Sequence, residues 1–145
     1  MATRIQVVFD CADPDRLSRF WATALHYKLQ DPPDGFVSWE AWLADAGIPE
    51  SEWNSASGVV DPDGVGPRLF FQRVPEGKVV KNRVHLDLNV SSRHEVGAEE
   101  GRKRVDTEVE RLRGEGATVM RPGAEERGEY WVVMQDPEGN EFCTG

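Results

Sequence analysis

An internal duplication of a strand, a helix and further strands constrains the fold of this chain more than any other feature. Residues 4–13, RIQVVFDCAD, alternate apolar and other side chains as a strand with one buried face does. Residues 81–90, KNRVHLDLNV, repeat this pattern in the second half, and the turn sequences DPDG at 61–64 and DPEG at 136–139 follow at nearly the same distance. The chain therefore predicts one strand-rich module used twice.

Each half continues with a helix and more strands. After the first strand, Asp13 is a predicted N-cap, Pro14 takes the first helical position, and apolar residues recur at helical spacing through Leu25. Strands are predicted over SGVV (57–60), PRLFFQRV (67–74), EYWVVMQ (129–135) and NEFCT (140–144), with a second helix over 101–117. The predicted fold class is α+β, with two tandem β-α-β-β-β modules at about 3–75 and 82–145 in a single domain, 1–145.

The alternation in the second module places chemistry on one face of its first strand. One face carries Val84, Leu86, Leu88 and Val90, and the other carries Arg83, His85, Asp87 and Asn89. If the helices cover the apolar faces, the polar faces of the two sheets line a cleft between the modules. The segment 34–57, which contains Trp39, Trp42 and Trp53, is longer than its counterpart. A short helix beginning near Trp39 fits it, either as an aromatic lid or as a surface helix packed on the first sheet.

Composition excludes several classes of partner. The net charge of −9 argues against nucleic acid, since phosphate binding requires a basic surface. No apolar run is long enough to cross a membrane, and the first residues lack a signal-peptide pattern, so we expect a cytoplasmic protein. Cys11 and Cys143 are too few for a disulfide framework, which favours reduced thiols, although a single bridge between them stays open.

The residues that carry these features resemble the vicinal oxygen chelate superfamily, which includes glyoxalase I, bleomycin-resistance proteins and extradiol dioxygenases. They are IQVVFDCAD, VHLDL and DPEGNEFC. The longer segments CADPDRLSRFWATAL, GPRLFFQRVPEGKVVKNRVHLDL and WVVMQDPEGNEFC are similar to small glyoxalase-like proteins of actinobacteria, and the resemblance spans residues 3–144. It implies a cupped, incomplete barrel of mixed and antiparallel strands, often in homodimers.

The resemblance also implies positions for a metal site. Metal-dependent members place one ligand on the first and one on the last strand of each module, and these positions fall on Gln6, Gln72, His85 and Cys143. Such members typically have glutamate on the last strands, where this chain has Gln72 and Cys143. A divalent ion would therefore lack charge compensation unless Cys143 ionised, and one histidine is too few for a non-haem iron dioxygenase.

Two functions follow. The leading prediction is a protein that binds or sequesters a small organic molecule without a cofactor, with Gln6, Gln72, His85, Cys143, Trp39, Trp42 and Trp131 as contacts. The alternative is a glyoxalase-like lyase or isomerase that uses zinc, nickel, manganese or iron, with His85, Asp87 or Glu141 as candidate catalytic groups. The sequence leaves open whether the chain is an enzyme, and it leaves His85 as cleft wall, ligand contact or metal ligand.

Overall fold

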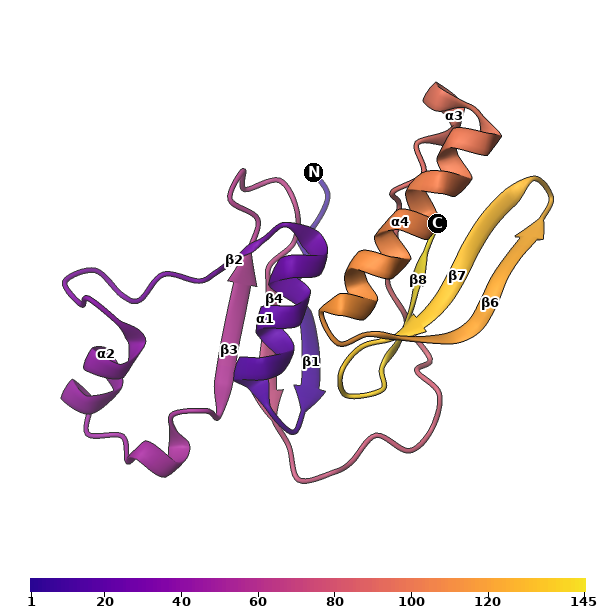
Figure 1. Cartoon of the computed structure of the whole chain (residues 1–145). Coiled ribbons are helices and arrows are strands. Elements are labelled where there is room, and N and C mark those ends of the chain that lie inside the picture. Colours follow the sequence, from indigo (N-terminus) through magenta and orange to yellow (C-terminus); the bar gives the residue numbers. More distant parts are fainter. The chain divides into compact units, whose positions relative to one another are not determined.

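The computed structural model describes all residues, 1–145. The chain forms two compact units, Met1–Gly77 and Lys78–Gly145, each of which contains one of the predicted modules (Figure 1). Each unit has a four-stranded mixed sheet and its own helices, which confirms the predicted α+β fold of two β-α-β-β-β modules. The grouping of both modules into a single domain stays a prediction. No helix of the structure combines the length and apolar character that crossing a membrane requires.

The sheet of the first unit is built around one parallel pair. Its strands, in sheet order, are β1 (Val7–Cys11), β4 (Leu69–Arg73), β3 (Ala56–Val60) and β2 (Lys28–Leu29). β1 runs parallel to β4, whereas β3 is antiparallel to both β4 and β2. Phe71 is fully buried on the side that α1 covers, so its neighbours Phe70 and Gln72 point to the opposite face.

Helix α1, Pro14–Leu25, covers one face of this sheet and begins as its sequence predicts. The Asp13 carboxylate accepts a hydrogen bond from the Arg16 backbone N–H at 3.2 Å, and Pro14 occupies the first turn. Leu17 and Trp21, spaced for one helix face, are buried. Their burial fixes the helix on β3 and β4.

The segment after β2 contains the predicted short helix. α2 spans Trp39–Asp45, with Ser38 as its N-cap, and a 3₁₀ helix, η1, follows at Glu50–Glu52. No residue of α2 is buried, but the Trp39 indole N–H donates to the Gln30 carbonyl at 2.7 Å and packs edge-to-face against Trp42. The tryptophans of this segment are therefore fixed by local contacts.

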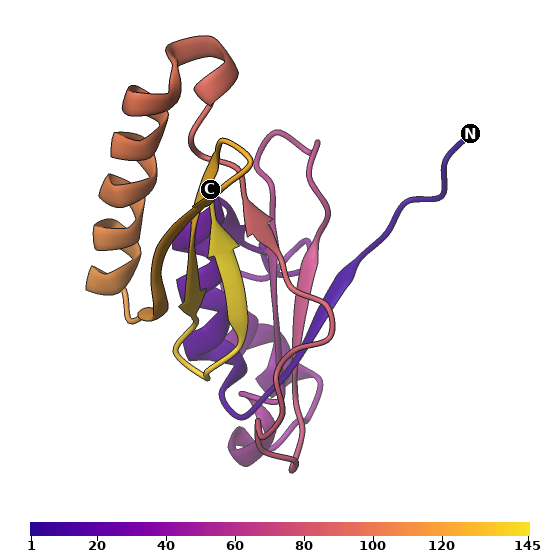
Figure 2. The same ribbon diagram turned by 90° about the vertical axis from the view of Figure 1, so that its right-hand side faces the viewer.

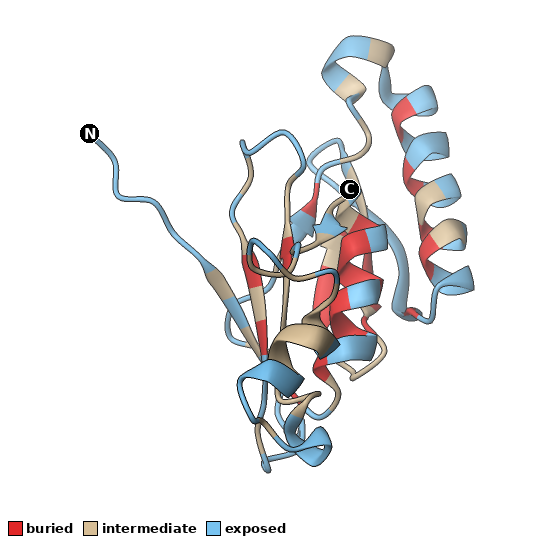
Figure 3. Ribbon diagram, turned by 90° about the vertical axis from the view of Figure 1, so that its left-hand side faces the viewer, coloured by how far each residue is buried: buried red, intermediate tan, exposed pale blue.

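The second unit pairs its first and last strands in the same way. Its strands, in sheet order, are β5 (Asp87–Leu88), β8 (Glu141–Thr144), β7 (Glu129–Gln135) and β6 (Thr118–Glu126). β5 is parallel to β8, and the other pairs are antiparallel. After the short α3 (Arg93–Val96), α4 (Ala98–Gly114) lies along one face of the sheet (Figure 2). Its buried residues, Gly101, Val105, Val109 and Leu112, form a stripe toward that sheet (Figure 3).

Three sequence predictions differ from the structure. β5 pairs only at Asp87 and Leu88, so the predicted strand over 81–90 is mostly irregular, and Val84 is 82% exposed. The second helix begins at Ala98, three residues before the predicted start at Gly101. β6 was not predicted, because Pro122 and Gly123 interrupt its pattern; the strand is exposed along its whole length, and its register shifts beside them.

Candidate functional site

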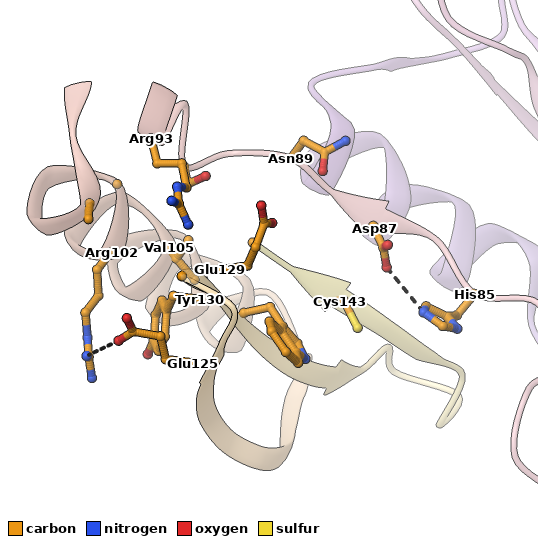
Figure 4. A pocket seen from close by; sticks show the side chains of 16 residues that line it. His85, Asp87, Asn89, Arg93, Arg102, Val105, Glu125, Glu129, Tyr130 and Cys143 are labelled. Atoms are coloured by element: carbon orange, nitrogen blue, oxygen red, sulfur yellow. Dashed lines mark ion pairs between the residues drawn. The ribbon is translucent and has the colours of Figure 1, made fainter. Parts of the chain in front are cut away.

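A cavity of about 330 Å³ lies in the second unit, at the end of the sheet where β8 finishes and β7 begins (Figure 4). Val105, Tyr130 and Trp131 contribute apolar and aromatic surface. Its polar and charged lining includes His85, Asp87, Asn89, Arg93, Arg102, Glu125, Glu129 and Cys143. The cavity therefore combines a small apolar wall with both signs of charge.

One wall holds a cluster of three metal-binding side chains, His85, Asp87 and Cys143. Asp87 and Cys143 are paired residues of the parallel strands β5 and β8, so both side chains project from the same face. His85 precedes Asp87 by two residues, and its Nε2 lies 3.3 Å from the Asp87 Oδ1. One nitrogen, oxygen or sulfur atom from each residue lies within 4.8 Å of the others.

Cys143 is a protonated thiol in this arrangement. Burial raises the pKa of the thiol above its usual 9.0, and the negative charge of Asp87 and a hydrogen bond to that carboxylate raise it further. Arg121 and Lys81 act in the opposite direction but are outweighed. At neutral pH the thiol is therefore a weak nucleophile, and Asp87 holds its proton.

We expect the Asp87→Asn variant to make Cys143 react faster with iodoacetamide at pH 8, by several-fold. Removal of the carboxylate charge lowers the pKa of the thiol and raises the thiolate fraction. Mass spectrometry of the peptide that contains Cys143 measures the rate, with the buried Cys11 as an internal control. An unchanged Cys143 rate would show that Asp87 does not hold the thiol proton.

Glu141, a candidate proton carrier, is tied to the start of the second unit. Its side chain is 6% exposed, and its carboxylate accepts from the Asn82 backbone N–H at 2.9 Å and from Lys78 Nζ at 3.1 Å. Burial alone would raise the pKa of Glu141, but the Asn82 N–H and the Lys78 ammonium together bring it below 4.5. The structure thus gives Glu141 a bonding role that anchors 78–82 to β8, and its proposed proton transfer stays a prediction.

The Glu141→Gln variant is expected to lower the free energy of unfolding at pH 7 by about 1–3 kcal/mol, the range for hydrogen bonds to charged groups. The native pKa of Glu141 lies below 4.5, so its contribution is complete above 4.5 and is lost as the pH falls through the native value. Urea unfolding from pH 7 to pH 3 should therefore show the wild-type advantage shrink in the acid range. The exposed Glu76→Gln is the control, and an advantage that grows on acidification would contradict the assignment.

The remaining predicted site residues belong to the first unit. Gln6 accepts a hydrogen bond from Arg68 at 2.8 Å, and Gln72 donates one to Asp10 at 2.7 Å. Gln72 and Asp10 are register partners on the sheet face opposite α1, as strand parity predicts. Both glutamines are exposed and engaged with neighbours of their own sheet.

The predicted aromatic contacts also divide between the two units. Trp39 lines a separate cavity of about 730 Å³ in the first unit, together with Trp53 and Phe70, and Trp42 packs against Trp39. Of the predicted ligand contacts, His85, Cys143 and Trp131 meet at the cavity of the second unit. Asp87, predicted only as a catalytic candidate, joins them.

Sequence reasoning missed the other wall of this cavity and one donor of the cluster. Asp87 was not predicted as a metal ligand, although its spacing of two residues from His85 signals a shared face. Arg102 lies in a charged run that reads as the outer face of a helix, and Tyr130 is one residue from the predicted Trp131. Arg93 had no signal, because its position depends on contacts with distant glycines.

The fold and this site define a class of protein, one built from paired β-α-β-β-β modules with a small-molecule cavity on a module. The sequence model of the glyoxalase-like domain family matches residues 6–145, almost the whole chain. The chain belongs to the glyoxalase-like domain family, within the vicinal oxygen chelate superfamily. No curated protein matches the sequence.

Solved structures support this fold at low sequence identity. A glyoxalase/bleomycin resistance protein/dioxygenase family enzyme from Burkholderia phytofirmans superposes with a TM-score of 0.60 at 15% identity and covers 96% of this chain and 94% of its own. A related domain from Frankia sp. gives 0.59 at 17% identity, with 99% and 96% covered. A fosfomycin resistance protein from Mesorhizobium loti gives 0.56 at 14% identity, with 99% and 90% covered. At these identities the likeness concerns the fold alone.

Proposed function

We propose that this protein binds a small organic molecule in the cavity of the second unit. The observation that carries the proposal is the lining: Tyr130, Trp131 and Val105 supply apolar contact, and the polar groups of the same cavity supply orientation. Its volume of about 330 Å³ suits a ligand of modest size. Binding or sequestration requires no reaction, and it is the general role that this family membership supports best.

A compound screen by thermal shift tests the proposal. A ligand at one hundred times its dissociation constant should stabilise the wild type by about 2.7 kcal/mol. Trp131→Ala should abolish the shift, whereas Trp53→Ala, which alters the cavity of the first unit, should retain it. If hits respond to Trp53→Ala and not to Trp131→Ala, or if the screen yields no hits, the proposal fails.

The cluster of His85, Asp87 and Cys143 supports a second candidate, a metal-dependent lyase or isomerase. Imidazole, carboxylate and thiolate are zinc ligands, and three protein ligands leave one position open, as in catalytic zinc sites. A bound zinc would act there as a Lewis acid toward a substrate oxygen. Asp87 supplies the negative charge that the metal-ligand positions implied by the family pattern lack.

We also propose a homodimer in the cytoplasm. The resemblance to dimeric family members supports the first part, and two free cysteines agree with a reducing compartment. Elution mass by light scattering tests the dimer, and a mass equal to one chain would refute it.

A further inference from the structure

Arg93, the first residue of α3, faces the same cavity with a charge that nothing in the chain meets. Its NH1 atom is buried and has no hydrogen-bond partner, and its guanidinium forms no ion pair. A buried charged donor without a partner is costly, since it has lost water and gained nothing in return. We infer that Arg93 binds an acidic group of the ligand, so that the molecule taken up by this cavity is a small organic anion, an inference that rests on the proposed function.

The position of Arg93 is built by two glycines from other elements. A Cβ at Gly101, in α4, would lie 2.9 Å from the Arg93 Cβ, so only glycine lets the helix approach this closely. A Cβ at Gly128 would lie 3.3 Å from NH2 of Arg93, and Gly128 has a φ of 77° in the tight turn between β6 and β7. α4 and the β6–β7 hairpin thus hold the guanidinium between them.

The other charges of the cavity are already matched. Glu125 pairs with Arg102 at 3.8 Å, and Asp87 pairs with His85 at 3.3 Å, as the dashed lines in Figure 4 show. Glu129 lines the cavity and is exposed, but no ion pair joins it to Arg93. Arg93 is therefore the cation left to meet an incoming anion, and its planar fork of N–H donors suits the two oxygens of a carboxylate or a phosphonate.

The wall next to Arg93 favours an apolar or aromatic body on the same molecule. Arg102 lies 4.5 Å from the centre of the Tyr130 ring, and the Tyr130 hydroxyl donates to Asp106 at 2.6 Å. Gly123 leaves space for this ring, since a Cβ there would collide with it. The ring is thus held in place before a ligand arrives, and Val105 lines the same space.

The test compares matched probes by calorimetry or NMR titration of the full chain. Benzoate and benzylphosphonate carry the two kinds of acidic group, and benzamide is the neutral analogue. Wild type should bind at least one of the anions about tenfold or more tightly than benzamide, and Arg93→Gln should remove that preference without changing benzamide binding. Arg104→Gln, an exposed arginine of α4, is the control and should leave all three affinities unchanged.

Stability separates this role from a structural one. Because the Arg93 guanidinium forms no bond within the chain, Arg93→Met should not lower the unfolding temperature without ligand. A marked loss of stability in Arg93→Met, equal anion affinity in wild type and Arg93→Gln, or no binding of either anion would overturn the inference. Neutral molecules whose binding depends on Trp131 would then still support the proposed function, whereas a screen without Trp131-dependent hits would refute it.

Discussion

Phe142→Ala is expected to lower the free energy of unfolding of the second unit by about 3–5 kcal/mol, the range for truncating a buried phenylalanine. Phe142 is 0% exposed and lies on β8, opposite the fully buried Met134 of β7. Loss of its ring leaves a void under the strand that also carries Cys143, so the cluster with His85 and Asp87 should loosen together with the core.

Urea unfolding followed by hydrogen exchange measures the effect for each unit. Amides of β7 and β8 should lose protection, whereas amides of α1 and β4 in the first unit serve as the internal reference. Phe142→Leu keeps most of the volume and should cost less than about 1.5 kcal/mol. A loss below about 1 kcal/mol for Phe142→Ala would mean that β8 does not depend on this side chain.

Local signals predicted the elements whose stability is itself local or set by burial. The Asp13 cap, Pro14 and the apolar face of α1 are read directly from neighbouring residues, and each occurs as predicted. The strands β4, β7 and β8 carry alternation that one buried face imposes. These elements need no knowledge of distant contacts, because the pattern of burial is written along each of them.

The prediction failed where pairing decides the outcome. The residues 81–90 alternate well, yet β5 is short because only Asp87 and Leu88 pair with β8. β6 has weak alternation and contains Pro122, but it forms because β7 offers an edge to pair with. Neither the end of a ladder nor the presence of a partner strand can be read from one segment.

The same limit applies to the candidate site. Strand parity predicted the face that carries His85 and Asp87, and the resemblance placed Cys143 at a ligand position. Their meeting depends on the parallel pairing of β5 with β8, which the sequence alone does not specify. Arg93 reaches the cavity through Gly101 and Gly128, which lie far apart in the chain.

Zinc binding is expected to discriminate between the two ligand sets that the sequence and the structure suggest. If His85, Asp87 and Cys143 hold the ion, wild type should bind one zinc per chain, and His85→Ala or Asp87→Asn should weaken binding by more than about 100-fold. That factor is the upper end of the effect of altering a group that only supports a ligand, so the loss of a direct ligand should exceed it.

Gln72→Ala separates this set from the one that the family pattern implies, which contains Gln72 and lacks Asp87. Gln72 bonds to Asp10 of its own sheet, so its removal should leave zinc affinity unchanged if the cluster is the site. Competition with a chromophoric chelator measures the affinities, and proton release on binding reports the conversion of the Cys143 thiol to a thiolate. Equal zinc affinity in wild type and Asp87→Asn, with a loss in Gln72→Ala, would reject the cluster as the metal site. Retained affinity in all three variants would reject both sets and leave the binding of an organic molecule as the function that the cavity supports.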